Sequence, residues 1–281
     1  MKKLALFAAL AFSACQSDTK NLEHKVDELN KKLDQLIASG GRPGAAAQQR
    51  PQRPEPDRAK TYAVPVDGDP SDGPADAKVT LVKAYDYACP YCEKVRDTMD
   101  ELRKKYKDDL RVVFKQFVVH PQVATAPALA FCAAAKQGKG IPMDALLWDK
   151  GFKAHQFDKD AGEGAQAQRC WDSAAGCPIA LGFAQELQLD QNKFKADMKE
   201  CQQLTQKDMG DLQKLGVGAT PSFFINGRFI SGAMPIDNFT QLIDEELGKA
   251  KQRIEQGTPA AQYYQQWILD KGLKTLEAPK Q

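Results

Sequence analysis

Two cysteines separated by two residues have the type and spacing for redox chemistry. Cys89 and Cys92 form a Cys-Pro-Tyr-Cys tetrad between an apolar, β-branched segment and a segment with helical periodicity. A thiolate at the first turn of a helix is stabilised by unpaired backbone N–H groups and by the helix dipole, so Cys89 would ionise readily. Cys92, nearly one turn further, would lie close enough to attack a mixed disulfide at Cys89. The tetrad predicts thiol–disulfide exchange, with Cys89 attacking and Cys92 resolving.

Metal binding is the main other use of such a pair. A structural zinc site needs a second pair of Cys or His ligands, which the chain lacks, and haem attachment needs histidine where the chain has Glu93. Cu(I) bound by the two soft thiolates, in a lipoprotein binding module or scaffold, remains the alternative from another class. We expect no metal and no cofactor other than the redox-active disulfide.

The elements around the tetrad follow a strand–helix–strand order. Buried strands are predicted at Val79–Tyr87, Leu110–Val119, Pro221–Ile225 and Arg228–Ile230, the last two joined by the turn Asn226-Gly227. Helices are predicted from Cys89 to about Tyr106, across an insert at about 122–215, from Ile236 to about Glu255, and from about Pro259 to Leu269. This order predicts an α/β fold with a mixed sheet covered on both faces.

The tetrad and the segment 216–227, which contains Thr220-Pro221, closely resemble the DsbA-like thioredoxin family over roughly residues 65–250. The resemblance implies a thioredoxin fold with a helical insertion and a cis proline, Pro221, against the active-site cysteines. It also implies an apolar surface around Tyr91, Pro221 and Phe223 that holds extended substrate. The substrate-binding residues it implies are Pro90, Tyr91, Thr220 and Pro221.

One position departs from the family pattern. The family usually has an acidic residue six positions before the first cysteine, where this chain has Lys83. An inward-pointing Lys83 would favour the Cys89 thiolate and remove the usual buried proton acceptor. If the strand is shifted, Asp86 or Glu93 would handle the proton, and if Lys83 reaches solvent it has no catalytic role. We expect His120 to be a loop residue rather than a catalytic base.

Four further cysteines allow three pairings. Cys170 and Cys177 flank a glycine-containing turn, which makes a local bridge plausible and leaves Cys132 to pair with Cys201. We read these pairs as structural disulfides. The alternative is that some are buried free thiols.

The first 14 residues have the pattern of a secretory signal: a basic start, a short apolar run and small residues before Cys15. A cysteine in this place resembles the bacterial lipoprotein signal, which implies lipidation of Cys15. Gln16, the next residue, resembles a sorting signal for the outer membrane. The alternative is an ordinary signal peptide cut nearby.

A helical stalk and a linker are predicted after the signal. Apolar residues repeat with heptad spacing within 15–38, at Leu22, Val26, Leu29, Leu33 and Leu36. We expect residues 19–37 to form a homo-oligomeric coiled coil, or else an amphipathic helix without a partner. Residues 39–60 are rich in Gly, Pro, Ala, Gln and Arg and predict a flexible linker, followed by one folded domain at 61–281.

Bulk properties limit the function classes. The net charge of +2 over 281 residues gives no reason to expect nucleic-acid binding. We expect a periplasmic enzyme, lipid-anchored at the outer membrane of a Gram-negative bacterium, that forms or isomerises disulfides. Its partners would be unfolded or partly oxidised exported proteins and a membrane redox partner. Thr220 and the stalk resemble isomerases and ScsC-like trimers, whereas a monomer would resemble the oxidase DsbA.

Overall fold

The computed structural model describes residues 24–32, 55–157 and 169–276. The chain divides into two units, Met1–Gln52 and Arg53–Gln281. The predicted signal, Cys15 and residues 33–54 of the predicted stalk and linker lie outside the described residues. No helix in the described ranges is both long and apolar enough to cross a membrane.

The described part of the first unit is a short helix at residues 24–32, and all of it is exposed. Val26 is 49% and Leu29 is 65% exposed, so these two positions of the predicted heptad seam are uncovered in the single chain. Leu22, Leu33 and Leu36 lie outside the described residues, and the coiled coil stays a prediction.

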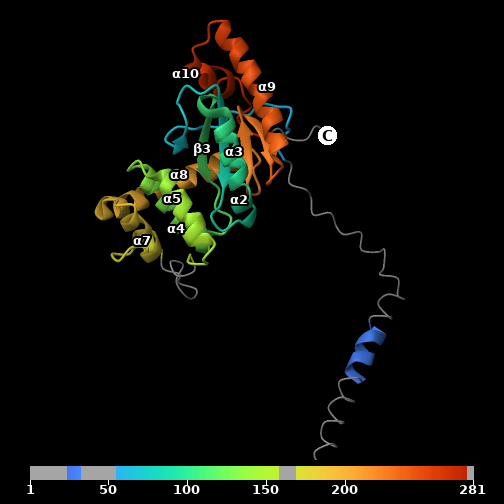
Figure 1. Ribbon diagram of the computed structural model, residues 1–281, viewed down its shortest axis with the longest axis vertical. Coiled ribbons are helices and arrows are strands. Elements are labelled where there is room, and N and C mark those ends of the chain that lie inside the picture. The colour runs from blue at the N-terminus through green and yellow to red at the C-terminus, as the bar shows by residue number, and fades with distance from the viewer. Residues whose placement is uncertain (1–23, 33–54, 158–168, 277–281) are drawn as a thin grey trace, which may run out of the picture. The chain divides into compact units, whose positions relative to one another are not determined.

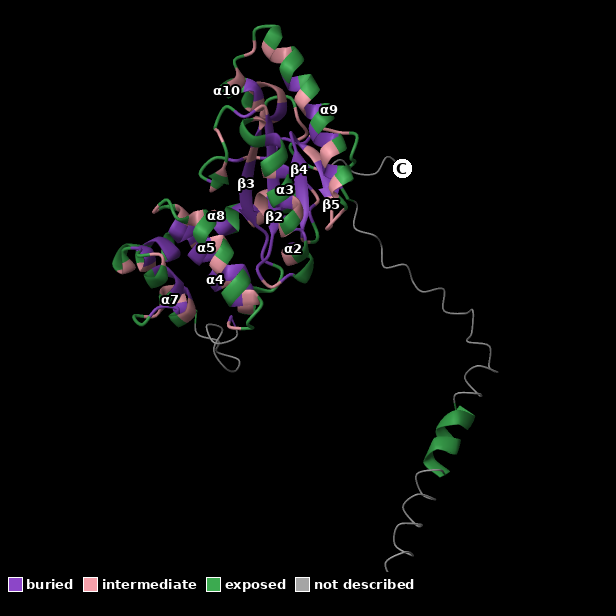
Figure 2. Ribbon diagram, viewed as in Figure 1, coloured by how far each residue is buried: buried purple, intermediate pink, exposed green. Residues whose placement is uncertain are grey.

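The second unit is a sheet with helices packed around it (Figure 1). The sheet has five strands in the order β1-β3-β2-β4-β5. β2 and β3 are parallel, and the other neighbouring strands are antiparallel. All residues of β2 and β4 are buried, as Figure 2 shows for the centre of the sheet, because helices and loops cover both faces. The strands are β1 (Ser71–Asp72), β2 (Val79–Tyr85), β3 (Leu110–Gln116), β4 (Ser222–Ile225) and β5 (Arg228–Ser231).

The crossover between β2 and β3 contains α2 (Pro90–Lys94), α3 (Arg96–Tyr106) and the short 3-10 helix η1 (Lys107–Asp109). The single helix predicted from Cys89 to Tyr106 is therefore two helices. They are separated at the buried residue Val95, whose ψ of −2° departs from helical geometry. β2 and β3 also end two and three residues before their predicted ends.

Each face of the sheet packs against a different part of the chain. On one face, Leu81, Tyr85 and Phe114 join a large core with α3 and with α9 (Ile236–Glu255). On the other face, Val82 and Val113 pack against the C-terminal end of α8 (Gln191–Lys214) and the segment at 62–66. Alternate residues of one strand therefore lie in two separate cores.

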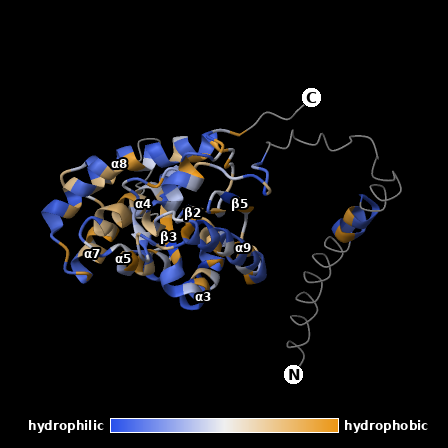
Figure 3. Ribbon diagram, turned by 90° about the horizontal axis from the view of Figure 1, so that it is seen from above, coloured by the Kyte–Doolittle hydropathy of each residue, from blue (hydrophilic) through white to orange (hydrophobic). Residues whose placement is uncertain are grey.

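The insertion between β3 and β4 is helical, as expected. Its long helix α8 carries hydrophobic and hydrophilic residues along its length (Figure 3), whereas residues 126–134 of α4 are buried throughout. A disulfide between Cys132 and Cys201 joins these two helices, and a local one joins Cys170 to Cys177. The elements are α4 (Pro121–Ala135), α5 (Gly140–Leu146), the π-helix η2 (Leu147–Phe152), η3 (Cys170–Asp172), α7 (Pro178–Glu186) and α8 (Gln191–Lys214).

The two ends of the folded unit lie side by side. After α9, the chain forms α10 (Ala260–Tyr263) and the π-helix η4 (Tyr264–Leu269), and Leu273 then pairs with Tyr62 in a β-bridge. The Asp57 amide donates to the Tyr62 hydroxyl at 2.8 Å. This hydrogen bond fixes Asp57 to the start of the folded unit.

Candidate active site

The cysteine tetrad lies at the junction of β2 with α2. Cys89 has an extended backbone at the N-cap of α2, and Pro90 occupies the first turn, where a missing N–H costs nothing. Cys92 lies within that helix, and its amide donates to the Cys89 carbonyl at 3.0 Å. Both are free thiols, with Cys89 5% exposed and Cys92 fully buried. The outer sulfur is therefore the one that an incoming thiol or disulfide can reach.

A loop far away in the sequence lies against the first cysteine. The Thr220–Pro221 peptide bond is cis and leads into β4, the neighbour of β2 in the sheet. The Cys89 Sγ donates to the Thr220 carbonyl at 3.3 Å. Pro221 is buried and Thr220 is half-buried. The structure thus brings together the two sequence motifs that the resemblance connected.

The two thiols have opposite electrostatic environments. The pKa of Cys89 is lowered to about 6, first by a hydrogen bond from the Cys92 thiol and, against some desolvation, also by the backbone N–H groups of Cys92 and Tyr91. The pKa of Cys92 is raised far above its ordinary value, mainly by burial and further by the neighbouring Cys89. At neutral pH, Cys89 is therefore the thiolate and Cys92 the thiol.

The rim of the site is apolar but differs from the expected surface. Tyr91 is 62% exposed and Pro90 is exposed, as a substrate-contacting rim requires. Phe223 was expected there, but it is fully buried and packs edge-on against Phe239, with ring centroids 4.9 Å apart, because its side of β4 faces α9. Val119 is 41% exposed just after β3, where the sequence pattern predicted a buried strand.

The carboxylates of Asp86 and Glu93, the other two candidates for proton handling, each bind groups outside the cysteine pair. The buried Asp86 carboxylate accepts hydrogen bonds from the amides of Ala88, Val119 and His120, at 2.6, 2.6 and 2.8 Å. Its oxygens are therefore used to join two loops. Glu93 lies at the surface, 3.2 Å from the Lys153 ammonium. The His120 side chain is half exposed, and its Nδ1 is 3.3 Å from Asp86.

The Lys83 side chain points into the protein and does not reach solvent, the first of the two orientations considered from the sequence. The residue is 2% exposed, and its Nζ lies 4.4 Å from the centroid of the Tyr85 ring and 5.8 Å from that of Phe114. Burial lowers the pKa of Lys83, while the negative charges of Asp144 and an ionised Cys92 act in the opposite direction. Lys83 also lowers the pKa of Cys92, although burial outweighs this effect.

A buried polar network next to Lys83 was missed in the sequence. The hydroxyls of Tyr85 and Tyr87 are 3.1 Å apart, and the Tyr87 hydroxyl donates to Asp144 at 2.7 Å. The Trp148 indole N–H also donates to Asp144, at 3.2 Å. The sequence did indicate that Lys83 and Tyr85 lie on the same face of the sheet, because they are two positions apart in a predicted strand. Nothing local links them to Asp144.

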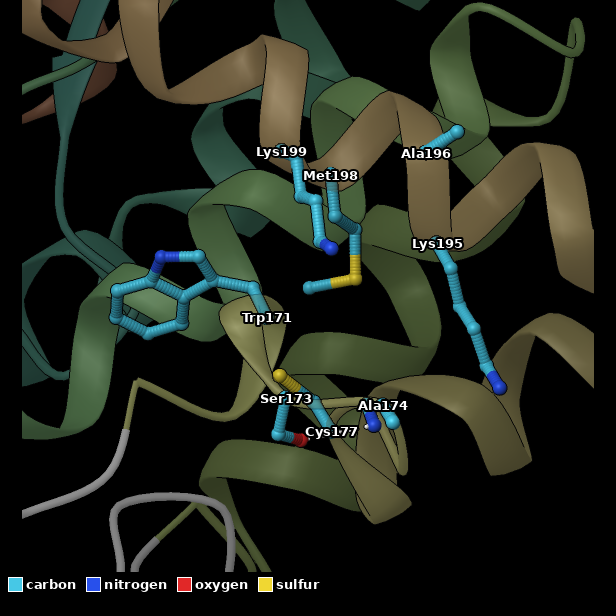
Figure 4. A pocket seen from close by; sticks show the side chains of 9 residues that line it. Trp171, Ser173, Ala174, Cys177, Lys195, Ala196, Met198 and Lys199 are labelled. Carbon is cyan, nitrogen blue, oxygen red and sulfur yellow. Dashed lines mark hydrogen bonds between the residues drawn. The ribbon is translucent and has the colours of Figure 1, made fainter.

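The remaining cysteines, and a pocket beside one of them, lie apart from the tetrad. The structure pairs Cys170 with Cys177 and Cys132 with Cys201, the arrangement favoured from the sequence. A pocket of about 270 Å³ beside Cys177 is lined by Trp171, Met198 and Lys199 among others, and neither cysteine of the tetrad is part of it (Figure 4). Within the described ranges, no group of three or more His, Cys, Asp or Glu side chains is arranged to hold a metal ion.

Comparisons with curated proteins give partial matches. The chain is 29% identical over 174 residues to a Na⁺/H⁺ antiporter NhaA from Herminiimonas arsenicoxydans, covering 61% of this chain and 24% of that protein. It is 34% identical over 178 residues to an NhaA 1 from Mycolicibacterium vanbaalenii, covering 62% and 26%. The matched part is thus about a quarter of the length of these relatives.

Solved structures and a family model identify the fold. BdbD from Bacillus subtilis is 21% identical with a TM-score of 0.51, covering 69% of this chain and all of that one. Wolbachia pipientis α-DsbA1 is 19% identical with a TM-score of 0.52, covering 68% and 96%. Both show that the chain has the thioredoxin fold in its DsbA-like form. The thioredoxin family model matches residues 66–245, which contain the tetrad, the insertion and the cis-proline loop, and the chain therefore belongs to the thioredoxin family.

Proposed function

We propose that the protein is a thiol:disulfide oxidoreductase that forms or isomerises disulfides in exported proteins through Cys89 and Cys92. The observation that carries this proposal is the asymmetry of the pair. Cys89, at a helix N-cap beside the Thr220 carbonyl, has a pKa lowered to about 6, while Cys92 is buried and protonated. Such a pair combines an accessible nucleophile with a protected resolving thiol.

In the oxidising direction, the substrate supplies two thiols and the protein supplies its disulfide. A substrate thiolate attacks the Cys89 sulfur, the Cys89–Cys92 bond breaks, and Cys92 leaves and takes up a proton. A second substrate thiolate attacks the mixed disulfide at the substrate sulfur and releases Cys89 as a thiolate. Two electrons pass from the substrate to the cysteine pair, and the low pKa of Cys89 makes it a good leaving group.

Isomerisation starts from the reduced pair and needs no net electron transfer. The Cys89 thiolate attacks a substrate disulfide, and a different substrate thiolate then attacks the mixed disulfide and regenerates Cys89. The exposed Tyr91 and Val119 side chains offer apolar contacts to an unfolded chain. We propose that Pro90, Thr220 and Pro221 complete this substrate-binding surface.

The function is tested by oxidation of reduced ribonuclease and reduction of insulin. We expect Cys89→Ser to abolish both reactions and Cys92→Ser to accumulate a mixed disulfide with the substrate. The Cys170→Ser/Cys177→Ser variant is the matched control, because it removes two cysteines bonded to each other outside the tetrad, and it should retain both reactions. Activity that survives in Cys89→Ser would reject the assignment.

We further propose that the protein acts in the periplasm, attached to the outer membrane through a lipid on Cys15 and recycled by a membrane redox partner. The two disulfides of the insertion support an oxidising compartment. Cys15→Ala should move the protein from the membrane fraction to the soluble fraction and prevent incorporation of labelled fatty acid. An unchanged distribution would exclude the anchor.

A homo-oligomer held by residues 19–37 is the remaining part of the proposal. The exposed Val26 and Leu29 side chains support it, because apolar residues at heptad spacing need a covering partner. Light scattering should report an oligomer for the delipidated protein and a monomer after deletion of 19–37. A monomeric full-length protein at micromolar concentration would reject it.

A further inference from the structure

The Lys83 ammonium group is buried, its charge interacts with that of Cys92, and none of the ion pairs within the described ranges includes it. Its contacts are the rings of Tyr85 and Phe114, and no carboxylate in the described part of the chain forms an ion pair with it. A buried charge without a partner is costly, and the usual response is loss of the proton. Something nearby must oppose that loss if Lys83 is to remain positive.

Two tyrosines link Lys83 to the carboxylate of Asp144, the acid whose charge most favours the protonated lysine. The Tyr85 ring, on which the Lys83 ammonium lies, carries a hydroxyl that is 3.1 Å from the Tyr87 hydroxyl. The Tyr87 hydroxyl in turn donates to the Asp144 carboxylate at 2.7 Å. The tyrosine rings pack at 5.1 Å, and both are fully buried. This leaves a solvent-poor path in which charges interact strongly.

Asp144 comes from the helical insertion and not from the thioredoxin core. It lies near the end of α5, where the Trp148 indole N–H fixes the same carboxylate oxygen that accepts from Tyr87. The insertion therefore supplies the acid that faces the lysine of β2. The charge of an ionised Cys92, on α2, also favours the protonated form of Lys83, whereas the charges of Arg96 and Arg103 on α3 oppose it.

We propose that Asp144 is a positioning residue for the redox pair, which through its charge and the Tyr87–Tyr85 link keeps Lys83 protonated beside Cys92. This inference rests on the proposed function and explains how the site is tuned. Positive charge on Lys83 stabilises Cys92 as it leaves in the oxidising step and stabilises the reduced pair. The helical insertion thereby sets the redox equilibrium of the thioredoxin core.

The proposal predicts the direction in which removal of the Asp144 charge shifts the equilibrium between the reduced and the oxidised pair, and this direction is opposite to that of a direct effect. Acting directly, the Asp144 carboxylate would repel a thiolate, so its removal would stabilise the reduced pair. Acting through Lys83, its removal takes positive charge away from the cysteine pair, which carries the Cys89 thiolate when reduced, and so destabilises the reduced pair. Asp144→Asn keeps an oxygen that can accept from Tyr87 and Trp148, so it changes charge with little change in shape.

The decisive measurement is the equilibrium constant of the full-length protein with glutathione, for Asp144→Asn with and without Lys83→Met. We expect Asp144→Asn to shift the equilibrium about threefold to tenfold toward the oxidised protein, where tenfold corresponds to about 30 mV. In the Lys83→Met background, the same substitution should have no effect or the opposite sign. Tyr87→Phe, which breaks the link and keeps the charge, should give a smaller shift toward the oxidised form.

Glu186→Gln on α7 is the matched control, because it removes an exposed acid of the insertion that pairs with Lys150. It should leave the equilibrium unchanged, and an equal shift would show a general field effect and overturn the proposal. A shift by Asp144→Asn toward the reduced form, or the same shift with and without Lys83, would also overturn it.

A second readout separates this inference from the proposed function. An NMR titration of isotope-labelled lysine should show that Asp144→Asn lowers the pKa of Lys83, whether or not the protein exchanges with glutathione. An unchanged Lys83 pKa would reject the role of Asp144. A protein that does not exchange with glutathione, while Lys83 responds as expected, would reject the function and not the link.

Discussion

Two lysines lie buried on neighbouring strands of the sheet, on opposite faces. In the register of β2 and β3, Lys83 pairs with Phe114 and Ala84 pairs with Lys115, so the two lysine side chains enter different cores. The Lys115 ammonium lies 2.6 Å from Asp69 and 2.5 Å from Asp208. The Lys83 ammonium lies on aromatic rings near the cysteines. The same side chain, equally buried, therefore has two different environments.

The two environments give the lysines different roles: the charge of Lys115 stabilises the fold, whereas the charge of Lys83 can influence the redox reaction of the cysteine pair. The two carboxylates raise the pKa of Lys115 despite its burial, whereas burial lowers the pKa of Lys83. A buried ion pair mainly holds its elements together, here β3, the loop before β1 and α8. A buried charge with a perturbed pKa and no direct counter-ion is typical of a functional site.

The largest test of this contrast is Lys115→Met. It leaves the Asp69 and Asp208 carboxylates buried without a cation, so we expect the free energy of unfolding to fall by about 3–5 kcal/mol. Urea denaturation of the oxidised protein measures this change. Replacing the two aspartates by asparagine in the same variant should recover most of the loss. A loss below about 1 kcal/mol would contradict a structural role for this ion pair.

Lys83→Met should have the opposite effect on stability. It replaces a buried ammonium, which has no ion-pair partner among the described residues, by an apolar chain of similar length. We therefore expect the free energy of unfolding to be unchanged or to rise by about 1 kcal/mol. The same denaturation experiment applies, with Lys115→Met as the comparison. If both lysine variants lost similar stability, the contrast between the two sites would not hold.

On the Lys115 side of the sheet, Asp208 should make the free energy of unfolding depend on pH. Burial raises the pKa of Asp208 to about 7 from an ordinary 3.8. Between these values the folded protein keeps a proton that the unfolded chain has lost, so this group makes stability fall as pH rises from about 4 to 7, by at most about 1.4 kcal/mol per pH unit. Asp208→Asn should remove that component, as a difference from the wild type measured at several pH values. A parallel pH profile for the two proteins would contradict it.

The smallest expected change concerns the reactivity of Cys89. Its alkylation rate should follow thiolate formation with a midpoint near pH 6, as the lowered pKa requires. Asp208→Asn, on the far face of the sheet, should leave this midpoint in place, while Lys83→Met should raise it by a fraction of a pH unit. A midpoint near 9 in the wild type would show that the helix N-cap does not activate this thiol.

Much of the fold followed from local patterns. The helix predicted from Ile236 to about Glu255 has those bounds in the structure, because its apolar residues keep helical spacing throughout. The tetrad and Thr220–Pro221 were also assigned from their motifs. The break at Val95 was not, since its apolar side chain fits an unbroken helical pattern and only its packing reveals the interruption.

The electrostatic part of the site could not be predicted in the same way. β2 is buried on both faces, so hydrophobic alternation does not tell which face Lys83 occupies. Asp144 is a single acid in a helical insertion, and only the tertiary fold brings it to Tyr87. The use of Asp86 to bind three amides was likewise invisible, because these amides come from two separate loops.

The β-bridge between Tyr62 and Leu273 holds the two ends of the domain close together. The Ala63 amide donates to Leu273 and the Leu273 amide donates to Thr61, so the chain enters and leaves the domain at one spot. A domain with adjacent entry and exit can be spliced into a larger polypeptide without opening its core. The matching region occupies about a quarter of the length of the curated relatives, so a domain of this kind occurs as one part of longer chains.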